Sequence, residues 1–549
     1  MVTLDNFPAT PFDKQTTQKL GFPDISLDAE DESEQDALIN QALISAVHAF
    51  SARWLPTGYF RKGAETSPQE SNAMKEYFME SIWSRAHQDV ARVLTRPSYR
   101  SILALYLFGT TPFSSKNKDG RIADYCFESA LRHYVHLRAK ASIATRFPSS
   151  ARQQTYDPMV NTPHMSKAQG EYIHLQDTAY WFGIVIDGSR ALTRCRPSVL
   201  LPGFCGEPQV WEPVRKQSET FDTIYRPMQS SKAMLTDETV LAMIQYGSSC
   251  KTLFWKVVSR VQDCLVHRSI EIPLETLMES VVQEMNRFER IFGPFLDKCA
   301  RDHVFLSEKS RISYLILSLH FHLGVLTLVD TLEAQSGVQV PCQHIDIGEC
   351  RLSSTRTVVN TINMMLLPPE SYNSENGANL IFKDPYPEHT RNALVRAAYS
   401  VLTLFRTMSV TRHAAEIMAS SLFTGLEVLT QVSYTAAESL DGLHGAYLET
   451  DLVVRHRRTD TSAHLTAPLS SPCDNPVSHE MFEEETVRQL DLAGDDPSLV
   501  KKTIERHETH HRPAADDFAW FDLSEIDLTS IMQDWAFEVC EGFLINNLS

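Results

Sequence analysis

Two histidines one helical turn apart, with a glutamate beside the first, have the spacing of a catalytic zinc site. His507, Glu508 and His511 match the pattern H-E-x-x-H, in which the histidines bind zinc and the glutamate acts as a base. The segment from Lys501 to Arg512 is highly charged, however, and Pro513 ends any helix there. A catalytic zinc also needs a third ligand and a partly dry cavity. We therefore expect a polar linker here and not a metalloprotease.

A second group of potential metal ligands lies between two expected helices. It consists of Cys342, His344, Asp346, Glu349 and Cys350. This spacing matches no zinc template, so an ordinary loop between helices is the favoured interpretation.

Asp516 and Asp517 resemble the aspartate-rich motif of all-α prenyl-chain enzymes, but no partner motif is apparent. Phosphate-binding glycine loops and the G-x-S-x-G motif are also missing. The sequence thus predicts no catalytic, cofactor-binding or metal-binding residue, and no enzyme.

Large apolar residues alternate with acids in the C-terminal stretch 516–549. The residues expected to matter most are Phe518, Trp520, Phe521, Leu523, Leu528, Met532 and Trp535. Such alternation after a polar linker is typical of an acidic activation segment, because the acids keep the apolar groups solvated and available to a partner. Leu528, Met532 and Trp535 also follow helical spacing, so they can present one face to a coactivator groove. A terminal helix that packs on the chain's own core is the alternative, and the pattern fits both.

The bulk composition predicts an all-α protein that does not bind DNA by itself. Hydrophobic residues make up 43% of the 549, and only 21 are glycine. Long apolar segments rich in helix formers favour helices over a sandwich or barrel. A net charge of -18 repels nucleic-acid phosphates unless a basic module compensates, and the longest basic run, Arg455 to Arg458, is short.

Ten cysteines without regular spacing predict free thiols in a reducing intracellular compartment.

Apolar periodicity divides the chain into four parts. They are a flexible acidic arm (1–33), a large all-α domain (34–445), a disordered polar linker (446–515) and the acidic, aromatic segment 516–549.

Within the all-α domain, helical spacing predicts a first helix from Asp36 to Leu55 and a long last helix from Arg412 to Leu443. A further helix is expected to start at Ser354. Ile312 to Val329 is almost entirely apolar, but it contains two serines and two histidines. We interpret it as a buried core helix and expect no membrane span.

The helix expected from Glu171 to Arg194 carries the most informative pattern. The residues of its apolar stripe are Leu175, Ala179, Phe182 and Ile186. Trp181 widens the stripe, so we expect this side chain in the core. Asp187, Arg190 and Arg194 share another face, and Asp187 and Arg190 have the i, i+3 spacing of an ion pair. Ion pairs that fix neighbouring helices are the favoured interpretation of this face, and the lining of a small-molecule site is the alternative.

This helix and the residues after it resemble the middle homology region of fungal zinc-cluster transcription factors. The matching residues read Asp177-Thr-Ala-Tyr-Trp-Phe182, Asp187-Gly-Ser-Arg190, Arg194-Cys-Arg-Pro197 and Leu200-Leu-Pro-Gly203. In that family an aromatic–Trp pair precedes an Asp, and a small–Arg–Pro turn follows. Trp181, Asp187 and Cys195-Arg196-Pro197 take those places here, and family members often have Gly where this chain has Cys195. The stretches Ala46–Pro56 and Leu319–Leu326 are similar to the family as well.

The resemblance implies an all-α regulatory domain in a nuclear protein that regulates transcription of a pathway gene set, for example a secondary-metabolite cluster. The six-cysteine zinc cluster with which the family reads DNA is not in this sequence, since no cysteine precedes Cys126. The resemblance therefore implies that the chain acts through coactivators or a DNA-binding partner protein, as a homo- or heterodimer. The alternative is that the zinc-cluster module was lost from the gene or is encoded upstream.

Two other functions stay open at this point. One is a scaffold or inhibitor that dimerises with other factors. The other is an all-α enzyme, which would be recognised by a deep pocket with convergent titratable groups.

Overall fold

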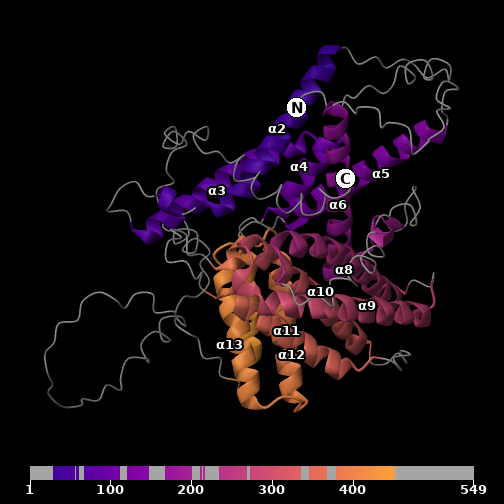
Figure 1. The fold of residues 1–549 in the computed structure, drawn as a ribbon. Coiled ribbons are helices and arrows are strands. Elements are labelled where there is room, and N and C mark those ends of the chain that lie inside the picture. Colours follow the sequence, from indigo (N-terminus) through magenta and orange to yellow (C-terminus); the bar gives the residue numbers. More distant parts are fainter. Residues whose placement is uncertain are drawn as a thin grey trace, which may run out of the picture. The chain divides into compact units, whose positions relative to one another are not determined.

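Every regular element in the described part of the chain is helical, as the sequence predicts (Figure 1). The computed structural model describes residues 29–55, 57–60, 67–111, 120–146, 167–200, 211–212, 214–216, 234–268, 272–335, 345–367, 379–450 and 452. The expected polar linker lies outside these residues except at its first few positions, and the segment 516–549 lies wholly outside them.

Five long helices form the N-terminal part of the described fold. They are α2 (Ala29–Ser51), α3 (Pro68–Ala91), α4 (Tyr99–Thr110), α5 (Gly120–Arg146) and α6 (Lys167–Arg194). Ser67 begins α3 with a capping box, in which it accepts the Glu70 backbone N–H and Glu70 accepts its N–H in return. Most residues of α4 are buried, because α4 packs against α2, α5 and α6.

Seven long helices form the C-terminal part and its continuous apolar core. They are α8 (Asp237–Val266), α9 (Leu274–Arg301), α10 (Glu308–Ala334), α11 (Ile347–Met365), α12 (Pro387–Arg406), α13 (Arg412–Leu429) and α14 (Tyr434–Leu448). Two short 3-10 turns, η1 (Ala52–Trp54) and η2 (Thr57–Phe60), lie between α2 and α3, and two more, η3 (His303–Phe305) and η4 (Leu380–Lys383), lie in the C-terminal part. Helix α10 packs against α8, α11 and α12, which accounts for its apolar surface on all sides.

The burial of α10 answers the membrane question raised by its sequence. This helix has the length and composition that could cross a membrane, with a mean hydropathy of 1.8 in its most apolar window. Of that window, 72% is buried inside the protein, and Leu315, Leu319 and Phe321 are at most 1% exposed. The interpretation as a buried core helix is confirmed.

Several predicted boundaries are wrong. Helix α2 runs from Ala29 to Ser51 and not from Asp36 to Leu55, so the expected acidic arm ends before residue 33. Helix α6 begins at Lys167, four residues before the expected start at Glu171. Helix α11 begins at Ile347 and not at Ser354, because Asp346 caps it by accepting the Glu349 backbone N–H. The long last helix is two helices, α13 and α14, which are separated by a turn at 430–433.

Helix α6 joins the two parts of the fold. It packs against α4 and α5 on one side and against α8 on the other. At Gly183 the approach to α4 is close, since a Cβ there would lie 2.9 Å from Tyr106 Oη. A second link runs from η1, where the buried Arg53 guanidinium donates to the backbone carbonyl of Pro385, just before α12.

Candidate functional site

The C-terminal end of α6 is organised around the buried carboxylate of Asp187. This side chain is 2% exposed and accepts the Ser198 hydroxyl, the Val199 backbone N–H at 2.9 Å and the Leu200 backbone N–H at 3.0 Å. Burial raises the pKa of Asp187, and these three hydrogen bonds oppose the shift. Asp187 thus fixes the turn that follows α6. No direct ion pair joins Asp187 and Arg190 among the described residues, although their opposite charges attract each other.

The arginines of this end of the helix converge instead on Asp124 of α5. Arg190 and Arg196 approach its carboxylate at 3.6 and 3.0 Å, and Arg194 makes a direct hydrogen bond to it. Arg190 is buried, with its guanidinium 5.8 Å from the centroid of the Phe127 ring. Burial lowers the pKa of Arg190, and the charges of Arg196 and Arg194 lower it further, while the charges of Asp124 and Asp187 raise it. The expectation of ion pairs to a neighbouring helix is therefore confirmed for Arg190 and Arg194.

Cys195 occupies a backbone position that suits glycine. Its φ is 49°, in the left-handed region, directly after the last residue of α6. Left-handed residues commonly end helices, and glycine is favoured there because it has no Cβ. Side chains at the end of α8 and just after it reach carbonyls at the end of α6 and just after it: Gln262 Nε2 donates to Leu192 O at 3.2 Å, and His267 Nε2 lies 2.8 Å from Cys195 O. The exposed Pro197 then keeps the chain from continuing as helix.

Trp181 is not the core residue that its spacing predicts. It is only half-buried and contacts the neighbouring Tyr180 ring edge-on, with 5.1 Å between the centroids. The next residue, Phe182, stacks on Tyr106 of α4 at 6.3 Å. The fully buried part of the apolar stripe on α6 is therefore narrower than expected.

A buried polar cluster, which the sequence analysis missed, lies where α6, α8 and α12 meet. Ser189 Oγ is hydrogen-bonded to His389 Nε2, and the His389 ring meets the edge of Trp255 with 5.2 Å between the centroids. Lys251 Nζ lies 4.1 Å from the centroid of Trp255. Burial lowers the pKa of Lys251 to about 7. Burial, and then the charge of Lys251, place the pKa of His389 well below its ordinary value. The signal for this cluster in the sequence was a lysine one turn before a tryptophan within the apolar stretch of α8.

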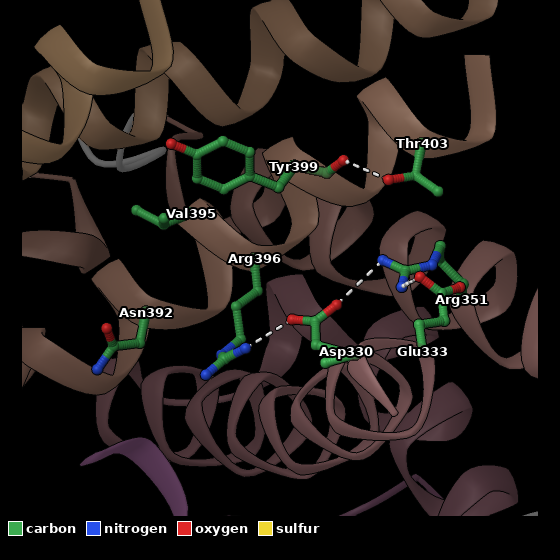
Figure 2. A pocket seen from close by; sticks show the side chains of 9 residues that line it. Asp330, Glu333, Arg351, Asn392, Val395, Arg396, Tyr399 and Thr403 are labelled. Atoms are coloured by element: carbon green, nitrogen blue, oxygen red, sulfur yellow. Dashed lines mark hydrogen bonds and ion pairs between the residues drawn. The ribbon is translucent and has the colours of Figure 1, made fainter. Parts of the chain in front are cut away.

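An open pocket of about 580 Å³ lies over α10, α11 and α12. In Figure 2 the carboxylate of Asp330 lies between two guanidinium groups, those of Arg351 at 3.1 Å and Arg396 at 2.6 Å. Arg351 also binds Glu333 at 2.7 Å, and Tyr399 lies across the pocket from these charges (Figure 2). The pocket thus contains two acids and two arginines that are already paired with one another. Sequence spacing could not reveal it, since its residues come from three helices.

The structure does not assemble a metal site from the described ligand candidates. Asp346 is the N-cap of α11, and Glu349 and Cys350 lie in the first turn of that helix and not in the loop that was expected. Within the described ranges, no group of three or more His, Cys, Asp or Glu side chains could hold a metal ion. Cys342, His344, the histidines of 507–511 and all the residues proposed for the activation segment lie outside the described residues.

Comparison of the chain with protein family models, with curated proteins and with solved structures found no match.

Proposed function

We propose that this chain is the regulatory body of a nuclear transcription regulator of the fungal zinc-cluster type, which relies on a partner to read DNA. It would activate or co-regulate a pathway gene set, such as a secondary-metabolite cluster. The proposal rests on the resemblance of the α6 region and on the acidic, aromatic composition of 516–549.

The observation that carries the proposal is that the residues of the resemblance act together in one structural unit. Asp187 holds the turn that contains Val199 and Leu200. Cys195 adopts the left-handed conformation at the position where family members often have glycine. Arg196 ends on Asp124 of the neighbouring helix. A chance resemblance in sequence would not require these residues to form one turn together.

The negative charge of the chain supports the proposal that a partner protein makes the contact with DNA. A net charge of -18 disfavours contact with phosphate backbones, and specific DNA readers present a basic face to the duplex. The purified chain should therefore give no specific footprint at physiological salt.

A reporter assay tests the activator function. The full chain is fused to a heterologous DNA-binding domain, with and without alanine at Trp520, Phe521, Leu528 and Trp535. We expect the unchanged fusion to activate and the fourfold variant to be silent, because large apolar anchors dominate binding in coactivator grooves. Alanine at His507, His510 and His511 is the matched control and should leave activation intact. An unchanged fusion that is expressed and nuclear but silent would refute the activator and favour the scaffold or inhibitor.

The enzyme alternative gains no support from the described residues. It needs a pocket into which titratable groups with shifted pKa values converge. Groups with strongly shifted pKa values, among them Lys251 and His389, lie in the packed core. The pocket of Figure 2 is lined by other residues, whose charges are paired.

A further inference from the structure

Three arginines meet one carboxylate at the C-terminal end of α6, and their charges do not balance. Arg190, Arg194 and Arg196 all pair with Asp124. The C-terminal end of a helix offsets roughly half a positive charge. Counted against Asp124 and the helix end alone, the three arginines leave an excess of more than one positive charge, and the buried Asp187 offsets part of it through its attraction to Arg190.

Two other acids near the arginines, Asp187 and Glu388, have hydrogen-bond or ion-pair partners of their own. Asp187 faces Arg190, but its oxygens accept the hydroxyl of Ser198 and the backbone N–H groups of the turn after α6. Glu388 on α12 forms its own ion pair with Arg391. Asp124 is therefore the carboxylate in contact with the three guanidinium groups.

The cluster of Arg190, Arg194 and Arg196 combines two arginines that are exposed to solvent with one that is held by its surroundings. The side chains of Arg194 and Arg196 are 37% and 51% exposed. The Arg190 side chain is only 9% exposed, and its Nε is buried without a hydrogen-bond partner among the described residues. Phe127 lies beneath the Arg190 guanidinium and limits its movement. An anion arriving from solvent would thus find one pre-positioned guanidinium and two adjustable ones.

We propose that this end of α6 binds a doubly charged oxyanion, the phosphoryl group of a small molecule. A guanidinium group presents its donors in a flat fork that matches two oxygens of a phosphate. Three forks offer far more donors than the two oxygens of Asp124 can accept. A phosphoryl group carries up to two negative charges and three acceptor oxygens, so it suits both the excess charge and the unused donors.

A purely structural role for the arginine cluster makes a different prediction. In that case Asp124 is the complete partner of the arginines, and the intact protein takes up no anion. In our proposal Asp124 shares the arginines with the anion and competes with it. The proposal is independent of transcriptional regulation, since anion binding is measured on the purified chain.

Equilibrium dialysis of the full chain against radiolabelled inorganic phosphate at pH 8 tests the proposal, with sodium chloride holding the ionic strength constant. We expect a single saturable site in the unchanged protein. The double variant Arg194→Gln, Arg196→Gln should bind about tenfold more weakly or worse, since two charge-assisted contacts are lost. Asp124→Asn should bind more tightly, because the competing charge is removed.

Arg132→Gln is the matched control, because Arg132 is an exposed arginine of the same helix α5 whose ion pair is with Glu128. It should bind phosphate as the unchanged protein does. Three outcomes would overturn the proposal: no saturable binding to the unchanged protein, equal binding by the double variant, or binding by Asp124→Asn alone. The last result would mean that Asp124 itself is the complete ligand of the arginines.

Discussion

The ammonium group of Lys251 lies 4.1 Å from the centre of the Trp255 ring, one turn further along α8, and both side chains are buried. A ring face attracts a cation, but it replaces only part of the hydration that a lysine loses in a core. The pKa of Lys251 therefore falls to about 7, so this residue gives the stability of the fold a particular dependence on pH.

Between about pH 7 and pH 10 the unfolded chain holds a proton on Lys251 that the folded chain has lost. Stability rises with pH wherever the unfolded state binds more protons, by about 1.4 kcal/mol per pH unit for one group. We expect the free energy of unfolding, relative to that of Lys251→Met, to increase across this window. Below pH 7 the methionine variant should be the more stable by a few kcal/mol. Urea titrations of both proteins at several pH values measure this, and a constant difference between them would contradict it.

The left-handed backbone of Cys195 predicts a stabilising substitution. Cys195→Gly should raise the free energy of unfolding by about 1 kcal/mol, because glycine removes the Cβ strain at a φ of 49°. Cys264→Gly is the control: Cys264 lies within helix α8, where glycine should cost about 1 kcal/mol. Thermal or urea unfolding distinguishes the two. Equal destabilisation by both changes would be evidence against the strained conformation.

Two helical glycines should respond to alanine with opposite signs. A Cβ at Gly324 in α10 would lie 2.8 Å from atoms of both Phe254 and Trp255, so Gly324→Ala should destabilise the fold by about 1–3 kcal/mol. At Gly442, on the exposed surface of α14, a Cβ would meet nothing within 4 Å. Gly442→Ala should stabilise by about 0.5–1 kcal/mol through helix propensity. An unfolding midpoint that Gly324→Ala leaves unchanged or raises would contradict the close packing of α8 and α10.

Truncation of Trp255 should cost far more than truncation of Trp181. Trp255 is 1% exposed and donates its Nε1 hydrogen to His320 O at 2.8 Å, so Trp255→Ala should destabilise by about 3–5 kcal/mol. Trp181 is half-buried, and its loss should cost about 1–2 kcal/mol. If urea unfolding gave a similar decrease in the free energy of unfolding for both variants, Trp181 would have to be a core residue after all.

Local periodicity was enough to predict most helices but not where each one stops. Helix α6 was expected to end at Arg194 and does, because Pro197 follows closely and ends it. The break at 430–433 between α13 and α14 contains neither glycine nor proline, so the sequence there reads as one continuous helix. It is the packing of both helices against α12 that separates them.

The contacts of the α6 region depend on distance in space and were therefore harder to predict. Asp187 and Arg190 have the spacing of an ion pair, but the Asp187 carboxylate accepts hydrogen bonds from backbone N–H groups 12 and 13 residues further along the chain. Asp124 lies 70 residues before Arg194, and no local pattern connects them. Ser189 and His389 are 200 residues apart. Such pairs follow from the packing of α5, α6 and α12, which a single sequence does not specify.

The bond from Arg53 to the carbonyl of Pro385 has a consequence for biosynthesis. The donor and the acceptor are 332 positions apart, and a ribosome adds on the order of 5–20 residues per second. The N-terminal helices are therefore made tens of seconds before the backbone that Arg53 will bind. During that interval a guanidinium destined for burial stays hydrated, and the surface around it stays open to other proteins. Translation speed and chaperone supply should thus influence the yield of this chain more than that of a protein whose buried contacts are local.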